Sequence, residues 1–77
     1  MQIADIIRAL GGAPAVSKGL GFPPGDVGAK RVRAWATRNS IPGEYWSALS
    51  AYSNENGLGI TLEVLAVAHA VIRAEAV

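Results

Sequence analysis

Four of the chain's seven lysine and arginine residues lie within nine positions, and their spacing suits contact with a polyanion. They are Lys30, Arg31, Arg33 and Arg38. On a helix, where each residue turns by about 100°, Lys30, Arg33 and Arg38 gather on one side and Arg31 lies at its flank. Arginine can make a bidentate contact with guanine, and both residue types neutralise phosphates. The segment therefore predicts a helix whose outer face touches DNA.

Three further polar residues complete the predicted contact. Thr37 shares the outer side of the same helix and suits a phosphate or a thymine methyl group. Asn39 is the only amide near the end of that helix, and Lys18 lies on the preceding helix, where it suits a phosphate contact. The predicted DNA-binding residues are Lys18, Lys30, Arg31, Arg33, Thr37, Arg38 and Asn39.

The distribution of charge agrees with this prediction. The overall charge is only +1, but five basic residues accompany the single acidic residue Asp26 between Ser17 and Asn39. The rest of the chain holds two basic and five acidic residues. A basic centre in an acidic frame is the electrostatic pattern of a nucleic-acid-binding surface.

Apolar residues recur at helical spacing along the chain, whereas the alternation typical of strands is scarce. The sequence predicts an all-α fold, a compact five-helix domain that spans residues 1–77 as a single unit. Glycines, prolines and capping residues mark where the helices begin and end. The expected helices are residues 3–10, a second from Pro14 to about Leu20, a third from Val27 or Gly28 to Arg38, a fourth opened by Pro42, and a fifth from Leu62 to about Glu75 with Thr61 as its cap.

The second and third helices, joined by a glycine-bearing turn, predict a helix-turn-helix. In the short form of that motif the inward residues of the recognition helix would be Val27 and Lys30, and a lysine would be buried. Val32 and Trp35 suit the inward positions far better, and Trp35 is expected in the core rather than stacked on a base. We therefore expect a turn about five residues longer than the short form, filled by the Pro-Pro-Gly-Asp segment at residues 23–26, with Asp26 as a cap for the third helix.

The fifth expected helix carries more apolar surface than one small core can cover. Hydrophobic residues make up 51% of the chain, and few charged residues interrupt this helix. We expect it to lie partly in the core and partly in a homodimer interface. The residues expected in that interface are Leu65, Ala68, Val71 and Ile72.

Several other classes of function find no support in the sequence. The chain has no cysteine, which excludes disulfides and thiolate metal sites, and His69 has no second histidine near it. No apolar run is long enough for a membrane span, and the N-terminus lacks the pattern of a signal peptide. The carboxylates are scattered and no phosphate-binding loop is present. We expect no enzyme activity, no metal, no cofactor and no small-molecule ligand, and a cytoplasmic, nucleoid-associated location.

Three stretches of the chain resemble one family. IADIIRALGGAPAVSKGLG, VRAWATRNSIPGEYWSAL and GITLEVLA are similar to the small Cro-like repressors of phages and prophages. The most specific part of the resemblance is the run Val32, Trp35, Arg38, Ile41 and Pro42. It implies a dimeric DNA-binding repressor of prophage or prophage-like genes, such as gene transfer agent clusters. Such a dimer would bind an inverted-repeat operator and exclude RNA polymerase from an overlapping promoter.

Two other readings of the sequence stay open. A protein-interaction module, of the antitoxin or adaptor kind, would use the apolar fifth helix to bind a different protein. A non-specific architectural protein would bind every DNA duplex with similar affinity.

Overall fold

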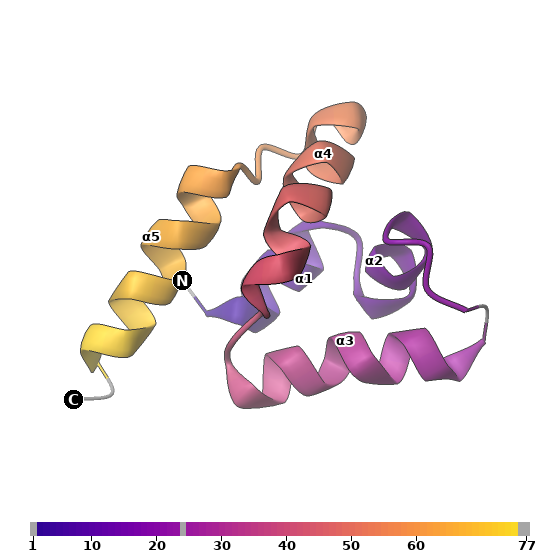
Figure 1. Cartoon of the computed structure of the whole chain (residues 1–77), viewed down its shortest axis with the longest axis horizontal. Helices are drawn as coiled ribbons and strands as arrows, with labels where there is room; N and C mark the ends of the chain where they lie inside the picture. Colours follow the sequence, from indigo (N-terminus) through magenta and orange to yellow (C-terminus); the bar gives the residue numbers. More distant parts are fainter. Residues whose placement is uncertain (1, 24, 76–77) are drawn as a thin grey trace.

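The computed structural model describes residues 2–23 and 25–75, and this part of the chain holds five α-helices and one short 3₁₀ turn (Figure 1). No strand occurs among these residues. The all-α fold class expected from the sequence is therefore confirmed. The elements are α1 (Ile3–Ala9), α2 (Ala13–Gly19), α3 (Asp26–Arg38), η1 (Gly43–Tyr45), α4 (Trp46–Asn56) and α5 (Leu62–Glu75).

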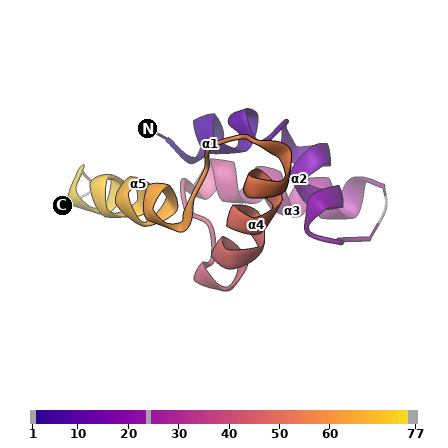
Figure 2. The same cartoon turned by 90° about the horizontal axis from the view of Figure 1, so that it is seen from above.

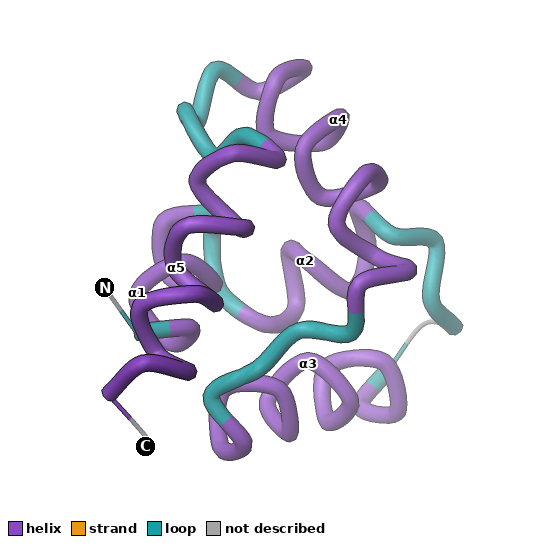
Figure 3. The backbone as a smooth tube through the Cα atoms, turned by 60° about the vertical axis from the view of Figure 1, so that its left-hand side comes forward, coloured by secondary structure: helices purple, strands orange, loops and turns teal. Residues whose placement is uncertain are grey.

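The longest side of the molecule is formed by α3, which runs along the lower edge in Figure 1. The helices α1 and α2 lie against it, and α2 and α3 share the most extensive contact of any two elements. In Figure 2 the helix α5 extends away from the other helices, and it touches mainly α4. Figure 3 shows that the segment after α3 runs back over that helix before α4 begins. One long face of α3 thus stays uncovered.

The core is built from the apolar stripes that the sequence spacing predicts. The residues Ile3, Ile6 and Leu10 of the first stripe meet Val32 and Trp35 of α3, and all five are almost completely buried. Burial of one such side chain contributes about 1.5–3 kcal/mol before the cost of ordering the chain. Ile41, Leu49, Ile60 and Leu65 close the core from the C-terminal half.

Most expected boundaries lie within one or two residues of the observed ones. Thr61 caps α5 as expected, because its Oγ1 accepts a hydrogen bond from the backbone N–H of Val64 at 3.1 Å. Asp26 does not act as a cap: it is the first residue of α3, and Gly25 holds the cap position with a positive φ of 90°. The segment that Pro42 opens is a 3₁₀ turn, closed by a bond of 3.1 Å from Tyr45 N–H to the Pro42 carbonyl, and α4 follows it.

Both backbone polar groups of Ile41, in the segment that follows α3, are bound by side chains. The backbone N–H donates to Nε2 of His69 at 2.8 Å, and the carbonyl accepts from Nε1 of Trp46 at 2.8 Å. The other ring nitrogen of His69, Nδ1, lies 2.7 Å from the carbonyl oxygen of Leu65 and must donate to it. His69 therefore has a structural role: it ties the segment that follows α3 to α5.

Replacing His69 with Phe should lower the free energy of unfolding by about 1–3 kcal/mol, because the buried N–H of Ile41 loses its partner. The Phe ring can still pack on Trp46, whose ring centroid lies 4.6 Å from that of His69. In His69→Gln the side-chain oxygen can accept the same hydrogen bond, so this variant should lose less. Urea denaturation of the three proteins measures the difference, and equal stability of the Phe variant and the wild type would exclude this role.

Candidate nucleic-acid interface

The inner side of α3 is fixed by close packing on α2. Val32 and Trp35 are buried there, as the sequence predicts, so the expected register of this helix is confirmed. The connection between α2 and α3 is six residues long, 20–25, and α3 begins at Asp26, one or two residues before the expected start. The extra residues of the long turn therefore lie partly in the connection and partly in the first turn of α3. Near this start Gly28 faces α2 so closely that an added Cβ would overlap the hydroxyl of Ser17 and lie 2.8 Å from the Cβ of Phe22.

The outer side of α3 is solvent-exposed along its whole length. The turn of about 100° per residue places Lys30 and Ala34 farthest from the core. Arg33 lies on one flank of this outer side, and Arg31 and Arg38 lie on the other. All four basic residues predicted for this helix are exposed, and the structure brings them together on one helix surface.

Arg33 has one acidic neighbour. Its guanidinium lies 3.8 Å from a carboxylate oxygen of Asp26, and the two side chains are 52% and 82% exposed. Exposed pairs of this kind contribute about 0–1 kcal/mol, because water and salt screen them. The pair therefore leaves Arg33 able to exchange Asp26 for a phosphate or a base.

Arg31 is held by an aromatic residue that sequence reasoning missed. Its guanidinium carbon lies 5.0 Å above the ring centre of Phe22, which comes from the connection between α2 and α3. The Phe22 ring itself packs edge-on against Trp35 and Tyr45, with centroid distances of 6.0 and 5.5 Å. A cation–π contact at an exposed site contributes about 0.5–1 kcal/mol. The core thus restricts where Arg31 points, and the aromatic residue within a Gly- and Pro-rich turn was the available signal.

The hydroxyl of Thr37 is already engaged within the helix. Its Oγ1 donates to the carbonyl oxygen of Arg33 at 3.1 Å. The methyl group and the lone pairs of the oxygen remain for an outside contact. Lys18 is exposed in the last turn of α2, the helix that packs most extensively on α3.

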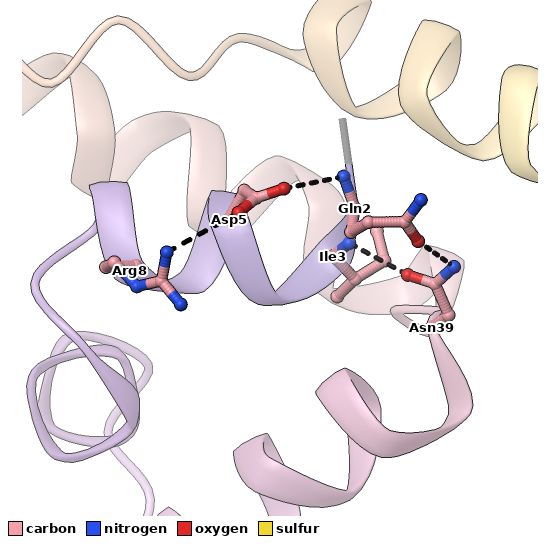
Figure 4. A network of polar contacts seen from close by, with 5 residues as sticks. All are labelled: Gln2, Ile3, Asp5, Arg8 and Asn39. Carbon is pink, nitrogen blue, oxygen red and sulfur yellow. Dashed lines mark hydrogen bonds and ion pairs between the residues drawn. The ribbon is translucent and has the colours of Figure 1, made fainter.

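Asn39 is the predicted contact residue that the structure reassigns. It ends α3 in the left-handed conformation, with φ 57° and ψ 41°. Its side-chain oxygen accepts the backbone N–H of Ile3 at 2.9 Å, and its amide donates to the side chain of Gln2 (Figure 4). Asn39 therefore caps the N-terminus of α1 from the end of α3, and its side-chain oxygen is engaged there rather than with DNA.

The polar network around Asn39 continues along α1. The carboxylate of Asp5 accepts the backbone N–H of Gln2 at 3.0 Å and lies 3.5 Å from the guanidinium of Arg8. Figure 4 shows these groups in one row that leads from the end of α3 along α1. The network joins two helices that are far apart in sequence and holds the C-terminal end of α3 in place.

Replacing Asn39 with Gly should cost about 1–2 kcal/mol of stability, because the cap of α1 is lost while the left-handed conformation stays accessible. Replacing it with Ala should cost about 1 kcal/mol more, because Ala also disfavours that conformation. Thermal unfolding of both variants measures the two effects separately. A wild-type melting temperature for the Gly variant would rule out the cap.

The residues expected in a dimer interface divide into two groups. Leu65 is completely buried and Ala68 is 5% exposed, so the prediction was wrong for these two: the chain's own core covers them. Ile72 is half-buried against the core, whereas Val71 is 42% exposed. The face of α5 that points away from the core instead carries Val67, which is 55% exposed, and a groove lined by Glu63, Val64, Val67, Ala68 and Val71.

The part of the chain that the structure describes gives no support for a membrane span or a metal site. No helix in residues 2–23 and 25–75 combines the length and apolarity that a membrane span requires. The same residues contain no cluster of three histidine or carboxylate side chains placed to hold a metal ion. Comparisons of the chain with models of known protein families, with curated proteins and with solved structures find no match.

Proposed function

We propose that this chain is a sequence-specific DNA-binding transcriptional regulator whose recognition helix is α3. The proposal rests on the exposed outer side of α3, which carries four basic residues while the inner side of the helix packs on α2. In this reading α2, the connection 20–25 and α3 form a helix-turn-helix, and α3 enters the major groove. The contacts from Arg31, Arg33, Arg38 and Lys30 divide between phosphates and base edges.

A homodimer completes the proposed mechanism. Two copies of α3 about 34 Å apart would enter successive major grooves of an inverted-repeat operator. The exposed apolar face of α5, with Val67 and Val71 at its centre, suits the contact between the copies. The resemblance to the Cro-like repressors favours repression of prophage-like genes, with RNA polymerase excluded by steric overlap.

Selection from a random duplex library tests this function. The full chain is incubated with the library at moderate salt, and bound duplexes are amplified and sequenced over several rounds. A specific regulator enriches one motif, expected as an inverted repeat, with an affinity that falls steeply as salt rises. Binding without an enriched motif would point to an architectural role. If no DNA is retained even when the incubation is repeated at low salt, the proposal is excluded.

Lys18 provides a separate prediction, since its place on α2 suits a phosphate rather than a base. Replacing Lys18 with Ala should weaken binding by a similar factor for every duplex and lower the salt slope by about one counterion. Competition between the selected duplex and scrambled duplexes, repeated at several salt concentrations, measures both quantities. A changed sequence preference in this variant would contradict a phosphate contact.

One observation favours a second candidate function. Val67 and Val71 lie on one outer face of α5 and are 55% and 42% exposed, so this face leaves apolar surface open to solvent. An adaptor or antitoxin-like protein could use this face to bind a different protein. Such a protein would stay monomeric alone and would show no salt-dependent retention on heparin, whereas the proposed DNA-binding protein would dimerise and would be retained on heparin until the salt is raised.

A further inference from the structure

Val27 is the most exposed large hydrophobic residue described in the chain, with 64% of its surface open to solvent. A single exposed valine is ordinary in itself. Its position is what distinguishes it, because it lies in the first turn of α3, next to the basic residues that are proposed to face DNA. Val27 is not one of the DNA-binding residues that the sequence predicts for this helix.

The side of α3 that lies farthest from the core carries a line of four residues, three with short side chains and one, Lys30, with a long side chain. Val27, Lys30, Ala34 and Thr37 follow each other at steps of three and four residues, and all four are exposed. The long side chains of Arg31, Arg33 and Arg38 lie on the flanks of this line. A helix with short residues in the middle and long cations on both sides can lie deep in a groove about 12 Å wide while the cations reach its phosphate walls.

The apolar groups on this line need an apolar partner. The thymine C5-methyl is the methyl group that unmodified B-DNA presents among the base edges of its major groove. Val27 and Ala34 lie two helical turns apart, about 10.5 Å along the axis, so they would meet different base pairs. The Thr37 hydroxyl donates its hydrogen to the backbone carbonyl of Arg33, which leaves the Thr37 methyl group as a third apolar contact.

We infer that α3 reads thymine methyl groups in the major groove through Val27, with Ala34 and the methyl of Thr37 as further contacts. This inference rests on the proposed function and adds to it the base that the outer line selects. The enriched operator should then contain a thymine at the position facing Val27. Loss of its methyl group should weaken binding about fourfold, because burying a group of that size contributes about 0.8 kcal/mol and a factor of ten corresponds to about 1.4 kcal/mol.

A double-mutant cycle between protein and DNA provides the test. Each thymine of the selected duplex is replaced in turn by deoxyuridine, which removes only the methyl group. Affinities are then measured for the wild-type chain and for Val27→Ala. The Ala variant keeps the fold, because Val27 is exposed and Ala favours a helix. Leu62→Ala, which shortens another exposed apolar side chain outside α3, is the protein control.

We expect one thymine position at which replacement by deoxyuridine lowers the affinity of the wild type and of Leu62→Ala about fourfold. At the same position the replacement should leave the affinity of Val27→Ala unchanged. Equal losses for all three proteins at every thymine, or no loss at any thymine, would overturn the inference and leave the DNA-binding function standing. Failure of the library to yield a bound duplex would overturn both together.

Discussion

Replacing Gly28 with Ala should destabilise the fold by about 1–3 kcal/mol, a large effect for the addition of one methyl group. The added Cβ would overlap the Ser17 hydroxyl and lie 2.8 Å from the Cβ of Phe22. Overpacking of a tight contact usually costs about 1–3 kcal/mol, and here α2 and the connection would both have to move. Urea denaturation of the variant measures the loss.

Two further variants make this prediction specific. Gly43→Ala adds the same methyl group where nothing lies within 4 Å, and it should be close to neutral. Adding Ser17→Ala to Gly28→Ala removes the hydroxyl that is overlapped and should restore part of the lost stability, so the two changes should not be additive. Wild-type stability for Gly28→Ala alone would mean that α2 and α3 do not approach each other this closely.

Replacing Lys30 with Glu should weaken binding to the selected duplex by at least about a hundredfold. Lys30 lies at the centre of the outer side of α3, so the change removes a cation at the groove and adds a repelled anion there. Loss of one good contact alone is expected to cost about 1–3 kcal/mol, and the like charge adds to it. Fluorescence anisotropy with a labelled duplex measures the change in affinity.

The control for Lys30→Glu has the same change in net charge at another place. Arg73 is exposed near the end of α5, away from α3, and Arg73→Glu also lowers the charge by two. This variant should bind within a few-fold of the wild type, because only long-range attraction is reduced. If both variants lose affinity to the same degree, binding follows net charge and α3 is not the contact surface.

The register of α3 could be predicted because it follows from a single physical choice. Burial of Val32 and Trp35 leaves every basic side chain of the helix exposed, whereas the short form of the turn would bury Lys30. Residue types and helical periodicity are enough to predict this register, and the burial of Val32 and Trp35 confirms it. The helices themselves follow from the same periodicity, together with glycine and proline signals at their ends.

The roles of Asn39 and His69 could not be predicted, because their partners are distant in sequence. Asn39 binds Gln2 and Ile3, 37 and 36 residues away, and His69 binds Ile41, 28 residues away. Residue type alone left Asn39 as a plausible base reader and His69 as a side chain without a role. Both are explained only by the backbone N–H groups that the fold brings to them.

The division of α5 into core and outer face was predicted only in part. This helix has more apolar residues than one face can hold, so its composition indicated contact with both the core and a second surface. The composition did not show which residues face the core and which face outward. The rotation of the helix against α4 decides this, and it places Leu65 and Ala68 inside and Val67 outside. The hydrogen bond from the Ile41 N–H to His69 helps to hold that rotation, and its two residues lie far apart in sequence.

A titration of the isotope-labelled chain with duplex DNA, followed by NMR, tests directly whether α3 contacts DNA. The backbone amide signals of each residue are assigned first, and duplex DNA is then added at low salt. We expect shifts concentrated in residues 26–38 and around Lys18. Residues of α4 and α5 should be far less affected, apart from those that contact a second copy of the chain. The shifts should vanish as salt is raised. Absence of any shift would exclude DNA binding, and shifts confined to α5 would place the contact surface on that helix instead of on α3.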